Sequence, residues 1–177
     1  MDICGLTYEQ GHGFVSNNTD ATIALGRALG KLLTQEDVLV LTGDLGAGKT
    51  QLTKGIAQGL GITSDITSPT FTIQMVHQGE NFPLYHFDLY RLDDPDQLGD
   101  CGLWDVMGYD GVCIIEWGEQ FLDDIGQDRL DVILDRMDFD VEPGVEPPRS
   151  IRFVSHNKRG EEILNKLADE LELYIKG

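Results

Sequence analysis

The sequence predicts a three-layer α/β protein, in which helices cover a mixed, mostly parallel sheet that also contains an antiparallel hairpin. Three observations support this fold class. Strand-like runs alternate with amphipathic helical segments along most of the chain. A glycine-rich turn over residues 43–48 joins an aliphatic run to a helical segment. Two β-rich segments, 71–77 and 82–89, are separated only by a short Gln-Gly-Glu-Asn turn, as in a hairpin.

The first elements in chain order are a strand, a helix and a second strand. A short strand is expected near residues 13–15. Residues 16–20 are rich in good helix caps, and the apolar residues that follow between 23 and 33 have helical spacing. The continuous aliphatic run at 38–41 is typical of a parallel strand buried on both faces.

Residues 43–50 read Gly-Asp-Leu-Gly-Ala-Gly-Lys-Thr and match the phosphate-loop pattern at every fixed position. The three glycines allow the backbone to wrap around a diphosphate, and the next helix adds positive partial charge at its N-terminus. Lys49 would reach the β- and γ-phosphates, and the Thr50 hydroxyl would ligate Mg²⁺. The preceding strand and following helix are the required context, so we expect a P-loop NTPase-like fold. The alternative is a glycine-rich strand-to-helix turn with an exposed lysine.

The second half of the chain completes the sheet. The hairpin is followed by a helical or irregular stretch over 93–108 and a buried strand at 112–115. Two further strands, 130–134 and 151–154, flank a Pro-rich acidic loop at 142–148.

The chain ends in a segment, 161–175, with apolar residues on one face and carboxylates on the other, which predicts a docked C-terminal helix.

Length and composition fit one domain spanning residues 1–177. The chain is 41% hydrophobic, which is enough for a proper core, and it is small for two independent domains. No apolar run approaches the length of a membrane span, and the N-terminus lacks the pattern of a signal peptide, so a cytoplasmic location is expected. Three widely spaced cysteines, Cys4, Cys101 and Cys113, suggest neither a disulfide framework nor a zinc site, and Cys113 lies in an apolar run.

The net charge is −18, from 31 acidic and 13 basic residues. Such a surface repels a phosphate backbone unless a local basic patch exists, and no such patch is visible in the sequence. Tight, direct binding to nucleic acid by the chain alone is therefore not expected. The charge serves solubility or, as an alternative, matches a partner with a basic surface.

Three further constellations are candidates for chemistry, and each also has an ordinary structural explanation. Asp88 lies at the end of a β-like segment, where it would orient a water or a metal ligand, or simply belong to the polar face of a strand. Glu116 ends the buried run at 112–115, at the sheet edge where ligands bind in open α/β folds, although strands often end in a solvated charge. Ser68-Pro69-Thr70 offers a hydroxyl that would sense a γ-phosphate, or forms a plain turn.

Taken in order, four motifs resemble one family closely. Gly-Asp-Leu-Gly-Ala-Gly-Lys-Thr stands at 43–50, Ser-Pro-Thr-Phe at 68–71, His-Phe-Asp-Leu-Tyr-Arg-Leu at 86–92 and Glu-Trp at 116–117. This series is similar to that of the TsaE family, formerly YjeE, over roughly residues 16–117. The series is far more specific than the phosphate loop alone.

The resemblance implies a bacterial cytoplasmic ATPase that uses ATP and Mg²⁺ and is required for making threonylcarbamoyladenosine beside the anticodon of tRNA. In that family TsaC makes the activated threonylcarbamoyl-adenylate, and TsaD, paired with TsaB, transfers it to tRNA. TsaE binds the TsaB–TsaD pair and hydrolyses ATP to reset the complex. Such a chain would meet tRNA only through its partners, which agrees with its acidic composition.

The resemblance also implies roles for individual residues. Lys49 would stabilise charge on the transferred group, while Thr50 and Glu116 would hold Mg²⁺. Asp88 would organise the attacking water, and Thr70 would sense the γ-phosphate. The residues implied to hold the nucleotide are Ser16, near part of the adenine pocket, and Gly46, Ala47, Gly48, Lys49, Thr50 and Gln51 around the phosphates.

Two other functions remain open at this point. A small-molecule P-loop kinase would need an acceptor site and an arginine-bearing lid, yet Arg91 is the only arginine between Lys54 and Asp128. A non-hydrolytic nucleotide-binding interaction module would still bind its partner when Glu116 or Asp88 is changed. An ATPase whose hydrolysis of ATP drives the complex would instead lose cycling of the complex.

Overall fold

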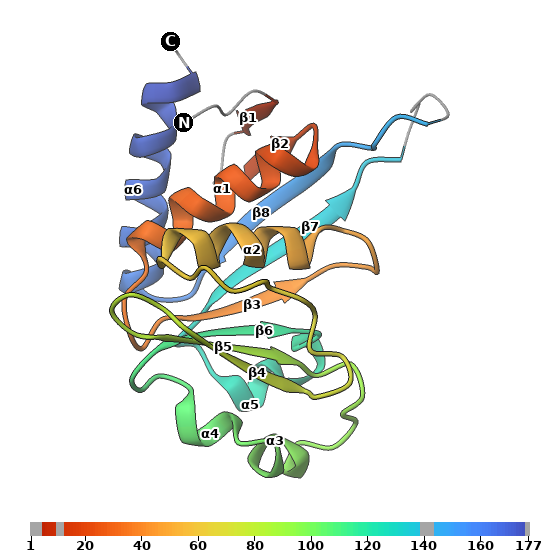
Figure 1. Cartoon of the computed structure of the whole chain (residues 1–177), viewed down its shortest axis with the longest axis vertical. Helices are drawn as coiled ribbons and strands as arrows, with labels where there is room; N and C mark the ends of the chain where they lie inside the picture. The colour runs from red at the N-terminus through yellow and green to blue at the C-terminus, as the bar shows by residue number, and fades with distance from the viewer. Residues whose placement is uncertain (1–4, 10–12, 139–143, 176–177) are drawn as a thin grey trace.

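The computed structural model describes residues 5–9, 13–138 and 144–175, which form one eight-stranded sheet and the helices packed on it (Figure 1). The strand order is β1-β2-β8-β7-β3-β6-β5-β4. The strands are β1 (Leu6–Glu9), β2 (Gly13–Ser16), β3 (Val38–Thr42), β4 (Gln74–Gln78), β5 (Pro83–Asp88), β6 (Val112–Glu116), β7 (Leu130–Arg136) and β8 (Arg149–Ser155). The helices are α1 (Thr19–Leu32), α2 (Lys49–Gly59), α3 (Asp96–Asp100), α4 (Leu103–Val106), the 3₁₀ turn η1 (Glu119–Phe121), α5 (Leu122–Ile125) and α6 (Lys158–Ile175).

The sheet is mixed, but the expectation that it is mostly parallel is wrong. The central pairs β7·β3, β3·β6 and β6·β5 are parallel. The pairs β1·β2, β2·β8, β8·β7 and β5·β4 are antiparallel. Parallel neighbours need a long crossover connection, whereas β7 and β8 follow each other directly in the order of described elements and pair antiparallel.

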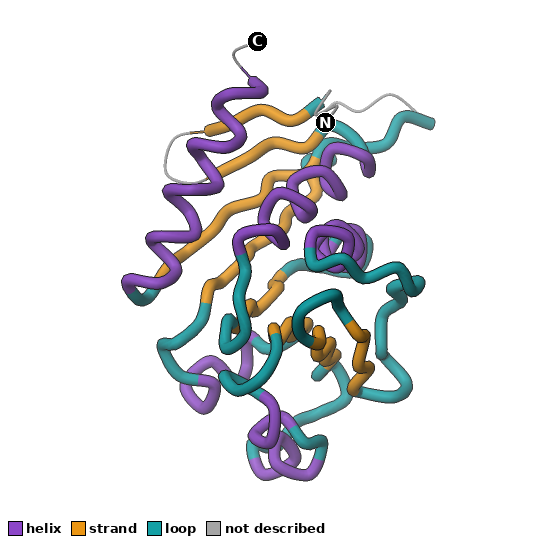
Figure 2. The backbone as a smooth tube through the Cα atoms, turned by 60° about the vertical axis from the view of Figure 1, so that its left-hand side comes forward, coloured by secondary structure: helices purple, strands orange, loops and turns teal. Residues whose placement is uncertain are grey.

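Helices lie on both sides of the sheet, as expected for three layers. The long helices α1, α2 and α6 bury one face, and their apolar residues form a single cluster with side chains such as Leu39, Leu84 and Ile114. The short elements α3, α4, η1 and α5 cover the opposite side of β3, β6 and β5, where Val40, Phe87 and related residues form a second cluster. In Figure 2 the long helices lie alongside the strands and the short ones gather at the lower end.

Helix α2, which follows the phosphate loop, is packed very closely against α1. Four glycines make this possible. A Cβ at Gly26 would lie 2.4 Å from the Leu52 carbonyl oxygen. A Cβ at Gly30 would lie 2.3 Å from the Ile56 carbonyl oxygen. Gly55 and Gly59 make the reciprocal approach to the backbone of α1. The glycines thus bring backbone against backbone and fix the position of α2.

Most predicted elements are confirmed, with shifted limits. Asn18 caps α1, since its side chain accepts a hydrogen bond of 2.8 Å from the Ala21 N–H. The hairpin forms from β4 and β5, but residues 71–73 form a turn before it, in which Ile73 has φ 64°. The stretch 93–108 contains the short helices α3 and α4.

Some elements were not foreseen. Strand β1 and the turn and helix over 119–125 have no strong pattern in the sequence, and α6 begins at Lys158, three residues earlier than expected. The acidic loop predicted over 142–148 connects β7 to β8, and its residues 142 and 143 lie outside the described residues.

Cys113 is buried, as expected, and burial raises the pKa of its thiol. Cys101 is a second free thiol, whereas Cys4 lies outside the described residues. Among the helices that the structure describes, none is long and apolar enough to cross a membrane.

Candidate functional site

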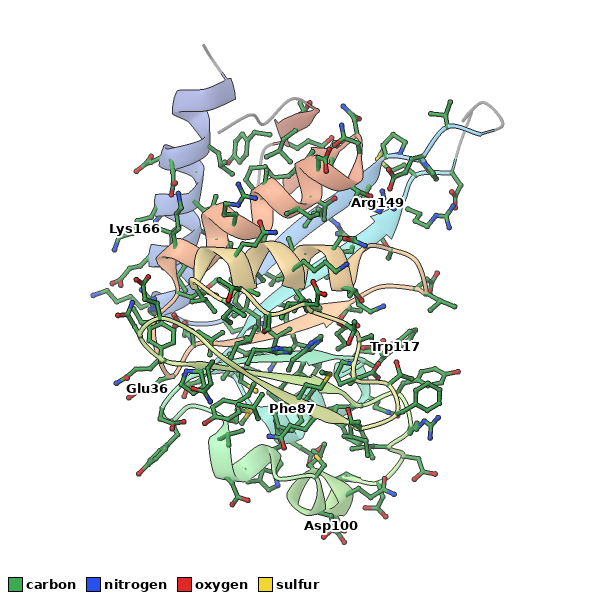
Figure 3. The ribbon with its side chains drawn as sticks, viewed as in Figure 1. Glu36, Phe87, Asp100, Trp117, Arg149 and Lys166 are labelled. Atoms are coloured by element: carbon green, nitrogen blue, oxygen red, sulfur yellow. The ribbon has the colours of Figure 1, made fainter. Side chains whose placement is uncertain are left out.

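A cavity of about 650 Å³ opens where β3, β5 and β6 end, beside the phosphate loop. Figure 3 shows Trp117 and Arg149 at this edge of the sheet, with Glu36 at the opposite edge. The volume of the cavity is in the range of small-molecule sites. The cavity is lined by Thr19, Leu45, Gly46, Gly48, Lys49, Thr50, Gln51, Ser68, Thr70, Asp88, Tyr90, Glu116, Trp117, Glu146 and Arg149.

The phosphate loop has the predicted context, since it joins buried strand β3 to helix α2. Gly46 and Gly48 have φ of 80° and 109°, a region that side chains with a Cβ rarely adopt. Gly43 combines φ 156° with a close approach, because a Cβ there would lie 2.3 Å from the Leu134 carbonyl oxygen. The loop therefore curls tightly over the end of β3, and α2 begins at Lys49 with its positive end at the cavity.

Lys49 lies inside the loop and is only 6% exposed. Its ammonium group donates hydrogen bonds to the carbonyl oxygens of Gly43 and Asp44, the second at 3.2 Å. The ring of Trp117 covers it, with Nζ 4.2 Å from the ring centroid. Burial lowers the pKa of Lys49, and nearby carboxylates, Glu116 first among them, oppose that shift.

Asp88 brings two of the predicted constellations together. Its Oδ2 accepts hydrogen bonds from the Ser68 and Thr70 hydroxyls, each at 2.9 Å. Its Oδ1 accepts one of 3.0 Å from the Tyr90 N–H. The carboxylate therefore ties the Ser68-Pro69-Thr70 turn to the end of β5, a contact that strand alternation alone did not predict.

Glu116 lies directly beside Asp88, since the two residues are partners in the parallel β5·β6 register. It is 2% exposed, and its Oε1 is 2.8 Å from Nε2 of His86, which is fully buried. Together with the Thr50 hydroxyl, the two carboxylates supply the hard oxygen donors that Mg²⁺ prefers. Lys49 and the N-terminus of α2 supply the positive charge that phosphates require. The residues present therefore fit Mg²⁺ and a nucleotide phosphate chain.

The cavity is also lined by residues that the sequence analysis missed. Arg149 Nη1 is 2.9 Å from Glu146 Oε1, which also accepts a hydrogen bond of 2.6 Å from the Thr19 hydroxyl. The Thr19 hydrogen bond, and then Arg149, lower the pKa of Glu146. These contacts fasten the end of the β7–β8 connection to the start of α1.

Arg149 also reaches the phosphate loop. A Cβ at Gly48 would lie 3.0 Å from its Cδ and Nε atoms. Its Nε is buried and has no hydrogen-bond partner among the described residues. Arg136, from β7, approaches Gly46 in the same way, with Nη1 3.5 Å from a Cβ built there. The arginine-bearing lid of a kinase was considered only for residues 54–128, whereas these two arginines come from later strands.

Two of the expected nucleotide residues do not line the cavity. The Ser16 side chain is fully buried and is bonded to the Asn18 carbonyl oxygen at 2.8 Å and to the Thr22 hydroxyl at 2.7 Å. It supports the turn before α1, and Thr19, the first residue of α1, lines the cavity in its place. The Ala47 methyl group packs in the hydrophobic core, so Ala47 contributes only its backbone to the phosphate loop.

The chain was compared with known proteins and structures. A family model described as "Threonylcarbamoyl adenosine biosynthesis protein TsaE" matches residues 16–142. A Bacillus subtilis protein named "tRNA threonylcarbamoyladenosine biosynthesis protein TsaE" is 38% identical over 151 residues, which cover 85% of this chain and 90% of that protein. A Streptomyces coelicolor protein of the same name is 47% identical over 115 residues, covering 63% and 77%. A solved structure described as "Crystal structure of Bacillus subtilus YdiB" superposes with a TM-score of 0.74 at 33% identity, over 89% of this chain and 94% of that one.

Proposed function

The chain belongs to the TsaE family of tRNA threonylcarbamoyladenosine biosynthesis proteins, and from that membership we propose that it is a Mg²⁺-dependent ATPase acting on the TsaB–TsaD pair. One observation supports this proposal most directly. A single cavity brings Lys49, Thr50, Asp88 and Glu116 together around a phosphate loop. Phosphoryl transfer to water needs little else from a protein than positioning and charge stabilisation.

The phosphate chain of ATP is held by the loop amides and by Lys49, whose ammonium group exchanges its carbonyl partners for phosphate oxygens. Thr50 and Glu116 hold Mg²⁺, the latter directly or through water. When bound, the cation neutralises charge on the phosphates.

Asp88 organises the attacking water. In the structure its carboxylate accepts three hydrogen bonds, two of them from Ser68 and Thr70. When the Thr70 hydroxyl turns to the γ-phosphate, one acceptor position on Oδ2 becomes free for a water. The presence of the γ-phosphate thereby determines, through Thr70, whether Asp88 Oδ2 can accept a hydrogen bond from the attacking water.

The nucleoside lies toward Thr19, Glu146 and Arg149, which line the same cavity as the phosphate loop. Arg149 is an arginine fixed on a strand and 8% exposed, unlike the mobile arginines of a kinase lid. Its unpaired Nε faces the phosphate loop, so the guanidinium group contributes to phosphate or ribose binding.

The acidic chain meets tRNA through TsaB and TsaD. A net charge of −18 disfavours direct contact with a polyanion but suits a basic surface on a protein partner. Hydrolysis by the chain would then serve the partner complex and not the transfer of the threonylcarbamoyl group itself.

The test is ATP hydrolysis by the purified chain with Mg²⁺, alone and with a TsaB–TsaD pair, while threonylcarbamoylation of tRNA is followed in parallel. We expect hydrolysis to rise with the pair and to sustain repeated turnover of tRNA. Phosphate passing to a small acceptor, without dependence on the pair, would assign the chain to the kinases instead. If Glu116→Gln stops hydrolysis but leaves tRNA turnover intact, the chain is a nucleotide-binding interaction module.

A further inference from the structure

A row of polar side chains begins at Ser64, crosses three neighbouring strands and ends at Glu116. Ser64 Oγ lies 3.2 Å from His77 Nδ1, and His86 Nε2 lies 2.8 Å from Glu116 Oε1. His77 is on β4, His86 on β5 and Glu116 on β6. His77 is 6% exposed and His86 is fully buried. The row therefore runs from an exposed serine, beneath α2, to the candidate metal-binding carboxylate.

The strand register places all three side chains on one face of the sheet. His77 pairs with Leu84 and His86 pairs with Ile114, both of which belong to the core cluster beneath α1 and α2. His86 is two residues beyond Leu84, and Glu116 is two residues beyond Ile114. His77 and His86 are therefore diagonal neighbours across an antiparallel pair, about 7–8 Å apart at the backbone and within reach of long side chains. His86 in turn reaches Glu116 on the next strand, at 2.8 Å.

Between the two histidines the row is incomplete. Among the residues the structure describes, His77 Nε2 and His86 Nδ1 are both buried without a hydrogen-bond partner. Buried polar atoms in folded proteins nearly always have a partner, and an ordered water supplies it where protein atoms do not. The two unpaired nitrogens belong to diagonally neighbouring rings, so one water between the rings would supply a partner to both.

The hydrogen-bonding roles of the His86 nitrogens follow from its contacts. In the 2.8 Å contact between the two side chains, a carboxylate oxygen of Glu116 accepts and His86 Nε2 donates. In a neutral imidazole the other nitrogen, Nδ1, is then an acceptor. Burial lowers the pKa of His77, and the neighbouring His86 ring lowers it further.

We propose that one buried water joins His77 Nε2 to His86 Nδ1, and that the resulting chain from Ser64 to Glu116 makes both histidines positioning residues for the Glu116 carboxylate. His86 holds the carboxylate directly, and the water and His77 fix the tautomer and ring orientation of His86. Outer partners of this kind commonly orient metal ligands. The inference rests on the proposed function only in assigning the cation to Glu116.

The first test uses the full chain labelled with ¹⁵N-histidine, free of nucleotide and metal, at pH 7.5. Two-bond ¹H–¹⁵N correlation spectra distinguish protonated from bare ring nitrogens. We expect His86 to carry a proton on Nε2, and a crystal structure of the same form to contain one water within hydrogen-bond distance of both unpaired nitrogens. A proton on Nδ1 of His86, or rings in contact with nothing between them, would overturn the proposal.

The second test measures Mn²⁺ binding in the presence of ADP by electron paramagnetic resonance. His86→Leu should weaken binding by about 10- to 100-fold. His86→Gln, whose amide still donates to Glu116, should restore most of it, and His77→Phe should weaken it by about 3- to 10-fold, because it acts one step further out. His156→Gln, which changes a histidine paired with Asp131, is the matched control and should bind as the native chain does.

The outcomes separate the two proposals. Native affinity in His86→Leu beside lost affinity in Glu116→Gln would overturn the positioning role alone. Native affinity in Glu116→Gln would overturn the cation site itself. Far-ultraviolet circular dichroism establishes that each variant is folded, and His86→Gln provides the decisive comparison if His86→Leu is not.

Discussion

At the scale of single residues, the ammonium group of Lys49 is held by contacts within the protein. Its ammonium group is satisfied by two carbonyl oxygens and covered by Trp117, which has the unusual φ of 58°. A bulky residue in this backbone region costs about 1–3 kcal/mol and is retained where the surroundings enforce it. We therefore expect the ammonium group to exchange these carbonyl oxygens for phosphate oxygens when a phosphate-bearing ligand binds.

We predict that Lys49→Ala weakens ATP binding by at least about 10- to 100-fold, because hydrogen bonds to charged groups contribute about 1.5–3 kcal/mol each. The free energy of unfolding should change little, since alanine is a good helix former at the first position of α2. Isothermal titration calorimetry with Mg²⁺-ATP measures the affinity. Lys54→Ala, in the same helix, is the control, and native affinity in Lys49→Ala would refute the assignment of the site.

Arg149, which lines the same cavity, provides a second prediction. Arg149→Ala should weaken ADP binding by about tenfold, since it removes a guanidinium group next to the phosphate loop. Arg149→Lys should restore little of the affinity, because an ammonium group lacks the planar fork of arginine. Arg152→Ala is the matched control on the same strand, where the arginine is more than half exposed. Equal affinities in Arg149→Ala and Arg152→Ala would exclude a role in binding.

At the scale of elements, the contact between α1 and α2 determines where the phosphate loop lies. We predict that Gly30→Ala and Gly55→Ala each lower the free energy of unfolding by about 1–3 kcal/mol or more, because the new methyl group meets backbone atoms that cannot move aside. The two helices must separate to accept it, so nucleotide affinity should fall as well. Urea unfolding and calorimetry measure the two effects.

Lys31→Ala, at an exposed position of α1, is the control for these glycine variants and should leave both quantities unchanged. An unchanged urea midpoint in Gly55→Ala would mean that the helices adjust freely, and that the close packing does not position the loop.

The same elements explain what the sequence could predict. The phosphate loop and its flanking strand and helix depend on local pattern, and they were found directly. Arg149 and Glu146 come from the end of the chain, and no local signal relates them to residue 48. The excess of antiparallel pairs likewise depends on how β7 returns to β8 and on the unforeseen β1. The hydrogen bonds of Asp88 with Ser68 and Thr70 needed the fold, because they join residues 18 to 20 positions apart.

At the scale of the whole molecule, charge is the dominant property. The formal net charge is −18, and several of the few cations are already paired with carboxylates. Such cations are not free to neutralise the phosphates of an external ligand, and a polyanion gains affinity for a protein largely through such contacts. Outside the cavity, the paired arginines are Arg129 with Asp131, Arg136 with Asp138, Arg152 with Asp135 and Arg159 with Asp37.

We therefore predict that the isolated chain binds tRNA no more tightly than about 10⁻⁴ M at physiological salt, the weak end of non-specific binding. Fluorescence anisotropy with labelled tRNA at about 50 and 200 mM salt measures both affinity and its salt dependence. The matched titration contains the TsaB–TsaD pair, with which the chain should join a tRNA complex. Tight binding by the chain alone that weakens steeply with salt would reveal a local basic surface and would make tRNA a direct ligand. Binding seen only with the pair would instead assign every contact with tRNA phosphates to the partners, leaving the acidic surface of this chain to face protein.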